Sequence, residues 1–344
     1  MKRLLAISLA FMALPACDSP PQESYPPCVI PETGLPEDVF CTGLYANHDP
    51  EQFEGDVMPY LPGVTLWSDG AEKHRYLWLP PGTQIDTSDM DVWNFPVGTK
   101  AWKEFRLDGE LVETRFFWKR AESDWESGTY VWDGAGNASL NTSKVPLLLD
   151  NGYEIPTAKD CGKCHHGGAD KLLGIEAVAL ALPTAEGETL TQLAADGLIS
   201  DPPSRTTIEL PLDASGTAGP ALGYLHANCG MPCHSTRGLG DETQLVLRLR
   251  AGEFWPTDGG ANPPPPDAAT TDSYLATVGV QPTTASVEQE FPDALRITPG
   301  DHSQSLLWLM TDRRDDYAMP PLVSHVVDEH GTQLLSDWID SLPP

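Results

Sequence analysis

The pattern of hydrophobic and polar positions divides the chain into a strand-rich part followed by a more helical part. Four segments have strand character: residues 73–79, 100–107, 111–119 and 129–132. They are rich in β-branched and aromatic residues, with partial alternation. Asp108 and Gly109 separate the middle two segments and predict a hairpin turn. We therefore expect residues 45–150 to form an all-β, sandwich-like domain.

Helical periodicity is clearest near the C-terminus. Residues 221–227 predict a helix, and Asp301 or Ser303 is placed to cap another that runs through Met310. Residues 328–342 predict an amphipathic helix. Its apolar face consists of Leu334, Leu335, Trp338, Ile339 and Leu342. The fold class expected is α+β and multidomain, with a β domain followed by mostly helical regions.

Three further segments complete the pattern. Residues 172–182 are mostly apolar and predict a short helix or a buried segment. Residues 241–250 alternate and predict a strand. Residues 251–290 are interpreted as an insertion, which begins with a proline-rich loop at 251–270.

Tryptophan is concentrated in the predicted β domain. Seven of the ten tryptophans lie there: Trp67, Trp78, Trp93, Trp102, Trp118, Trp125 and Trp132. Such a density is typical of a sandwich core or its rim, although a surface that binds sugar or a flat ligand would show it too.

The N-terminus resembles an export signal. Lys2 and Arg3 precede the apolar run 4–14, which is too short to span a bilayer. The run leads to Cys17 through a sequence similar to the lipobox of bacterial lipoproteins. We expect residues 1–16 to be a lipoprotein signal peptide and Cys17 to be lipidated, with plain secretion as the alternative. The protein would then be anchored in the bacterial envelope, facing the periplasm or the cell surface.

Cys28 and Cys41 lie in a stretch rich in proline and acidic residues, 17–44, which predicts a tether. The exported compartment is oxidising, so we expect these two cysteines to form a disulfide. With Cys17 as the lipid anchor, the other four of the seven cysteines belong to two motifs described below.

The net charge of −29 makes binding to nucleic acid or to anionic lipid headgroups unfavourable, because an acidic protein surface repels both. Membrane contact is expected only through the lipid. The charge favours a basic partner, but solubility alone also explains an acidic surface.

The first motif is Cys161-Gly162-Lys163-Cys164-His165. Cys-x-x-Cys-His is the attachment signature of c-type haem: the thiols bind the two vinyl groups, and the histidine ligates iron. A redox disulfide or half of a zinc site is the alternative. We assign residues 151–205 to a first haem region.

The second motif, residues 229–234, has one residue too many between Cys229 and Cys233. A helix precedes it, and Met319 with two prolines follows on the way to the closing helix. That order is typical of a small c-type cytochrome, which predicts a second haem ligated by His234 and Met319 in a domain at 206–344. A disulfide or a lost haem site is the alternative.

The sixth ligand of the first haem is open at this point. Five side chains are candidates: His226, Met58, His48, His74 and His166. His226 lies on the helix that leads into the second motif. An open position would permit ligand binding or peroxide chemistry.

Several segments together resemble a poorly characterised family of exported diheme c-type cytochromes. They are residues 66–73, 95–99, 113–115, 161–165, 224–229, 319–322 and 326–328. The resemblance covers most of residues 60–340. It implies a β-rich N-terminal region, two haem c sites and electron transfer. The sequence departs from the family at Cys229 and Cys233, where two intervening residues would be expected.

The leading hypothesis is an envelope lipoprotein with two covalent haem c groups, relaying electrons between redox partners of a basic or β-propeller type. It would be a carrier rather than an enzyme, since no catalytic acid–base or nucleophilic set stands out. The alternatives are a haem enzyme, either peroxidase-like or the haem subunit of a dehydrogenase, and a non-redox binding module with a degenerate second site.

Overall fold

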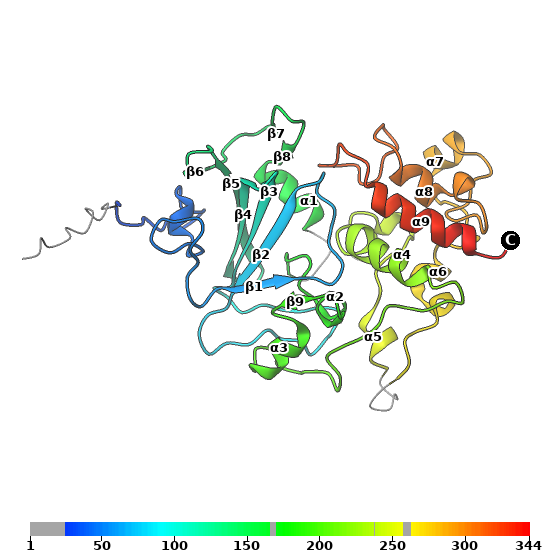
Figure 1. The fold of residues 1–344 in the computed structure, drawn as a ribbon, viewed down its shortest axis with the longest axis horizontal. Helices are drawn as coiled ribbons and strands as arrows, with labels where there is room; N and C mark the ends of the chain where they lie inside the picture. Colours follow the sequence, from blue (N-terminus) through cyan, green and yellow to red (C-terminus); the bar gives the residue numbers. More distant parts are fainter. Residues whose placement is uncertain (1–24, 166–169, 237, 257–262) are drawn as a thin grey trace, which may run out of the picture.

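A computed structural model describes residues 25–165, 170–236, 238–256 and 263–344 (Figure 1). The fold is α+β. A large antiparallel sheet lies in the N-terminal half, and helices α4 (Ala218–Leu225), α8 (Leu306–Thr311) and α9 (Glu329–Ser341) lie on the far side of the molecule. The predicted signal peptide 1–16 and Cys17 lie outside the described residues. No helix within the described ranges is long and apolar enough to cross a membrane.

The main sheet has seven strands in the order β6-β5-β4-β3-β2-β1-β9, all paired antiparallel. The strands are β1 (Met58–Leu61), β2 (Glu72–Trp78), β3 (Lys100–Leu107), β4 (Glu110–Ala121), β5 (Asp124–Trp132), β6 (Ala138–Leu140) and β9 (Glu186–Gly187). The four segments with strand character are confirmed. Asp108 and Gly109 both have positive φ, as the predicted hairpin turn requires. Two short strands, β7 (Leu147–Leu148) and β8 (Glu154–Ile155), pair separately.

The two faces of the sheet are covered by different material. One face, which we call the N-terminal face, carries Trp102, Phe116 and Tyr130. It packs against Val39 and Leu44 of the segment that precedes β1, which we call the leading segment. The opposite face, which we call the cavity face, carries Leu77, Ala101 and Phe117. These three residues belong to a larger hydrophobic cluster together with residues of the helices.

The expected sandwich was wrong, because the part of the chain that the structure describes places no second large sheet on either face. Alternation along a strand shows which residues share a face but does not show what covers that face. Four of the seven tryptophans, Trp93, Trp102, Trp125 and Trp132, are buried, which supports the interpretation as core.

Cys28 and Cys41 form the expected disulfide, which tethers the exposed start of the described chain to the segment over the N-terminal face. Asp38 caps the 3-10 helix Val39–Cys41 beside it.

Replacing both cysteines, in a Cys28→Ser/Cys41→Ser variant, should lower the free energy of unfolding by about 3 kcal/mol, because the disulfide closes a short loop of the unfolded chain. Their separation is 13 residues. Denaturant titration of both proteins under oxidising conditions measures this. Equal denaturation midpoints for the two proteins would show that the disulfide does not stabilise the fold and that the leading segment does not unfold together with the rest of the chain.

The helices are short apart from the last. They are α1 (Ala158–Cys164), α2 (Ala177–Ala181), α3 (Leu190–Ala195), α4 (Ala218–Leu225), α5 (Ala251–Phe254), α6 (Asp272–Leu275), α7 (Ala285–Glu290), α8 (Leu306–Thr311) and α9 (Glu329–Ser341). The predictions for 172–182, 221–227 and 328–342 are confirmed by α2, α4 and α9. Asp328 caps α9 by accepting a hydrogen bond from the Gly331 amide at 3.0 Å. α8 begins later than predicted, since a 3-10 turn occupies His302–Gln304.

The strand predicted at 241–250 was wrong. A 3-10 turn covers Asp241–Thr243, Gln244 has a positive φ, and residues 245–250 are irregular and pair with no strand. Leu247 donates instead to the His234 carbonyl at 2.9 Å, and Leu249 donates to Nδ1 of His226 at 3.0 Å. The alternation therefore reflects leucines buried against the second motif.

One hydrophobic cluster joins the sheet to the helical half. It includes Leu77 of β2, Val178 of α2, Leu222 of α4 and Trp338 of α9. Strand β9, from residues 186–187, also joins the sheet from beyond the expected β domain. The domain boundaries remain a prediction, but the two halves share a core, and the candidate site lies where they meet.

Candidate functional site

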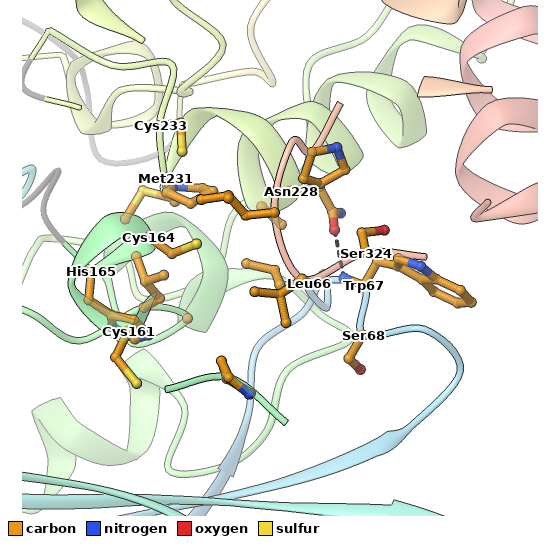
Figure 2. A pocket seen from close by; sticks show the side chains of 18 of the residues that line it. Leu66, Trp67, Ser68, Cys161, Cys164, His165, Asn228, Met231, Cys233 and Ser324 are labelled. Carbon is orange, nitrogen blue, oxygen red and sulfur yellow. Dashed lines mark hydrogen bonds between the residues drawn. The ribbon is translucent and has the colours of Figure 1, made fainter. Parts of the chain in front are cut away.

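A cavity of about 330 Å³ lies between the cavity face of the sheet and the helical half. Both cysteine motifs open onto it, although some 65 residues separate them in sequence. Figure 2 shows Cys161, Cys164 and His165 on one side of this pocket and Met231 and Cys233 on another. The candidate site residues that line it are Cys161, Cys164, His165, His226, Cys233, His234 and Met319.

The first motif is held by a short capped helix. Thr157 and Asp160 form a reciprocal capping box at the start of α1, in which each side chain accepts from the other residue's amide. Cys161 and Cys164 are three residues apart on this helix and so lie on one face. The His165 amide closes the last turn on the Cys161 carbonyl at 3.0 Å. The two thiols and the imidazole are therefore presented together.

His165 is oriented as an iron ligand would be. Its ring packs on Phe117 of β4, with centroids 4.5 Å apart. Nδ1 lies in hydrogen-bond contact with the Lys171 carbonyl, which can only accept, so Nδ1 carries the proton. Burial, together with Lys103, holds the pKa of His165 well below its usual range. The ring is therefore neutral, and the Nε2 lone pair is left for a ligand.

The four motif cysteines are free thiols. Burial raises the pKa of Cys161 and of Cys164, that of Cys229 to about 12 and that of Cys233 to about 11. A redox dithiol needs a lowered thiol pKa, and zinc binds thiolate, so these environments do not favour either alternative. Across the described ranges, no three His, Cys, Asp or Glu side chains are grouped to hold a metal ion together.

The extra residue of the second motif lies within helical backbone. α4 continues as a π-helical turn, His226–Gly230, and the amides of Cys233 and His234 both donate to the Cys229 carbonyl. A separation of four residues still places two side chains on one helical face. Cys233 lines the cavity, whereas Cys229 packs against the main hydrophobic cluster.

His234 is fixed by the loop that follows it. Its ring lies against Gly240, where an added Cβ would be 2.6 Å from Nδ1. The Thr243 hydroxyl is 3.5 Å from the same nitrogen and donates its own proton to the Gly240 carbonyl at 2.6 Å. Burial, followed by Arg296, lowers the pKa of His234 to about 4. His234 is therefore a second neutral imidazole with Nδ1 toward the protein.

His226 is not available as the sixth ligand of the first haem. Nδ1 accepts from the Leu249 amide at 3.0 Å, so the proton is on Nε2, which contacts Oε1 of Glu176 at 3.1 Å. The Glu176 carboxylate also accepts from two amides at the start of α2. His226 is 2% exposed. Neither ring nitrogen of His226 is free, so the prediction that His226 could be the sixth ligand of the first haem was wrong. Its contact with Glu176 instead joins the two motif regions.

The other predicted sixth ligands lie elsewhere. His48 stacks on Phe40 in the leading segment, His74 is exposed on β2, and Met58 packs on the main core. His166 lies outside the described residues. Met231 lines the cavity and also a small pocket beside His165. The sequence analysis missed this thioether because it lies between the two cysteines of an irregular motif.

Met319 reaches the cavity on a loop held to both halves of the molecule. Its amide donates to the Met310 carbonyl at 2.7 Å. Further along the loop, the His325 amide donates to Asp69 at 2.7 Å. The neighbouring Trp67 amide donates to Asn228, just before the second motif, at 2.6 Å (Figure 2). The segment that precedes β2 therefore fixes the Met319 loop relative to the second motif.

The floor of the cavity is cationic, which the sequence analysis did not anticipate. Lys73, Arg75, Lys103 and Arg115 line it from β2, β3 and β4. They occupy positions on the cavity face, where the neighbouring residues of the same strands include apolar core residues. The only sign of them in the sequence was a charged residue where the strand pattern would place an apolar one.

No family model matches the chain, and no curated protein or solved structure is significantly similar to it. Function is therefore inferred from the residues around the cavity. Membership of the diheme cytochrome family remains a prediction from the sequence.

Proposed function

We propose that this protein is an exported electron carrier with haem c attached at Cys161 and Cys164, and a second haem c at Cys229 and Cys233. The observation that carries the proposal is His165, a neutral imidazole whose Nδ1–H is bound to the Lys171 carbonyl and whose Nε2 has no hydrogen-bond partner among the described residues, next to two protonated thiols. Those residues fit the group that the motif implies.

Bound haem would supply reversible one-electron transfer at iron. The chain's part is attachment and ligation. Each thiol would add across one vinyl group, so that its S–H bond and the vinyl π bond would be replaced by one C–S bond and one C–H bond, with no oxidant consumed. His165 would ligate the first iron, and His234 with Met319 the second. A thioether ligand raises the reduction potential relative to two histidines.

The shared cavity supports a relay. Cys164 and Cys233 line the same cavity, and Cys164 lies close enough to contribute to the raised pKa of Cys233. Groups attached at these positions would be neighbours. The acidic chain favours a basic redox partner, and the lipid anchor at Cys17 would keep the carrier in the envelope.

A haem enzyme is the second candidate, and one observation favours it. Of the sixth ligands predicted from the sequence, those within the described residues are either engaged with protein or away from the cavity. The first iron would then be open unless Met231 ligates it. An open iron permits peroxide or small-ligand chemistry.

Spectroelectrochemical titration of the protein, matured with haem c, tests the proposal. We expect two reversible one-electron transitions and no spectral change with cyanide or peroxide. A spectral change with either reagent would favour the enzyme, and a colourless protein would favour a non-redox binding module.

A further inference from the structure

Three cations form a single row across the cavity face. Arg75 of β2 pairs in register with Lys103 of β3, and Lys103 pairs with Arg115 of β4. The next residue in the row is Thr129 of β5. Like charges directly opposite each other on neighbouring strands are destabilising. The row therefore costs stability unless an anion compensates it.

The row has little compensation from the protein. Arg75 is 3% exposed, and its Nε and Nη1 have no hydrogen-bond partner among the described residues. The same is true of the buried Thr129 hydroxyl. Arg115 is paired with Glu113 at 2.6 Å. Burial, and then the charges of Arg75 and Arg115, lower the pKa of Lys103 to about 7.

Lys119, a buried lysine on this face of β4, is fully compensated by the protein. Lys119 lies 2.9 Å from the Asp170 carboxylate and donates to the Phe95 carbonyl at 2.7 Å. No carboxylate in the described ranges pairs with Arg75 or Lys103. A buried charge that lacks a partner is costly, so the row is built for an anion that comes from outside the polypeptide.

The acidic residues around the cavity are engaged elsewhere or exposed. Asp160 pairs with Lys163, Glu176 with His226, and Glu154 with His325. Asp69 accepts from the Met319 loop, and Glu242 is exposed at the edge. Two of the three cations in the row have no carboxylate partner among the described residues, although the chain as a whole has a net charge of −29.

The row faces the first motif. Lys103 and Arg115 are both close enough to Cys161 to interact electrostatically with it. Phe117, two residues beyond Arg115 on β4, packs on His165. α1 packs against the neighbouring strand β5.

We propose that Arg75, Lys103 and Arg115 bind the two propionate carboxylates of the haem attached at Cys161 and Cys164. This rests on the proposed function, because it needs a haem at that motif. Arg75 can bind a carboxylate through its two unpaired N–H groups, while Lys103 and Arg115, the latter already paired with Glu113, add positive charge beside it. The same chemistry would also suit a soluble dicarboxylate, which is the competing source.

The test compares the wild-type holoprotein with Lys103→Met and Lys103→Arg. Lys100→Met is the matched control, because Lys100 lies on the same strand, points to the N-terminal face and contacts the Thr42 carbonyl. Removing Lys103 relieves repulsion within the row, so the variant should fold. We expect an unchanged haem count by intact mass, a lowered midpoint potential of the first haem and a shifted propionate band in resonance Raman spectra. Uncompensated propionate charge favours Fe(III), and Lys103→Arg should restore both signals.

Unchanged potential and Raman spectrum in Lys103→Met, with the haem count intact, would overturn the propionate assignment and leave the proposed function standing. A wild-type protein without haem at Cys161 would overturn both. In that case, calorimetric titration with succinate would show whether the row binds a soluble dicarboxylate instead, with loss of binding in Lys103→Met.

Discussion

A Cys161→Ala/Cys164→Ala variant should carry exactly one haem fewer than the wild-type protein. These two thiols lie on one face of α1 beside the neutral imidazole of His165, and no other described pair of cysteines could replace them there. Intact mass spectrometry of protein produced with haem c maturation gives the count directly. The remaining haem should keep the spectrum expected for His234 and Met319 ligation.

The Cys28→Ser/Cys41→Ser variant is the matched control for that experiment. It also removes two cysteines, but from a disulfide on the N-terminal side of the sheet, so it should keep the full haem count. An unchanged haem count in the Cys161→Ala/Cys164→Ala variant would show that the first motif does not attach haem.

A Gly240→Ala substitution should disturb the second haem and leave the first intact. The added methyl would lie 2.6 Å from Nδ1 and 2.8 Å from Cε1 of His234, so the ring or the loop must move. Overpacking of this kind costs about 1–3 kcal/mol. We expect part of the haem absorbance to change from low-spin to high-spin as His234 is displaced from iron. Magnetic circular dichroism would quantify that part.

Gly252→Ala provides the control, because no described atom outside the backbone of its own helix lies within 4 Å of the Cβ that it adds. It should leave both haem spectra unchanged. If Gly240→Ala also retained two low-spin haems, His234 would not be the ligand of the second iron.

Much of the sheet could be predicted from the sequence, because alternation with period two and an Asp-Gly turn are local signals. Residues 100–119 form the expected hairpin for that reason. What covers the sheet depends on contacts between distant segments. The leading segment with Val39 and Leu44 and the short strand 186–187 carry no local pattern that assigns them to the sheet.

The candidate site shows the same division. The spacing of residues 161–165 points to a cofactor without any structure, and the structure adds the hydrogen bond that sets the tautomer of His165. The sequence offered His226 as one of five candidate sixth ligands, but both of its nitrogens are hydrogen-bonded, one to Glu176 and one to the Leu249 amide. The cationic row could not be predicted either, since it depends on the register between β2, β3 and β4.

The most direct test of the account is the intact mass of the wild-type protein, expressed with haem c maturation, beside its pyridine haemochrome spectrum. The account predicts two covalent haems per chain, with thioether attachment at both motifs. One haem would contradict the two-centre relay and identify Cys229 and Cys233 as a site that no longer binds haem. A protein without haem would contradict the proposed function altogether.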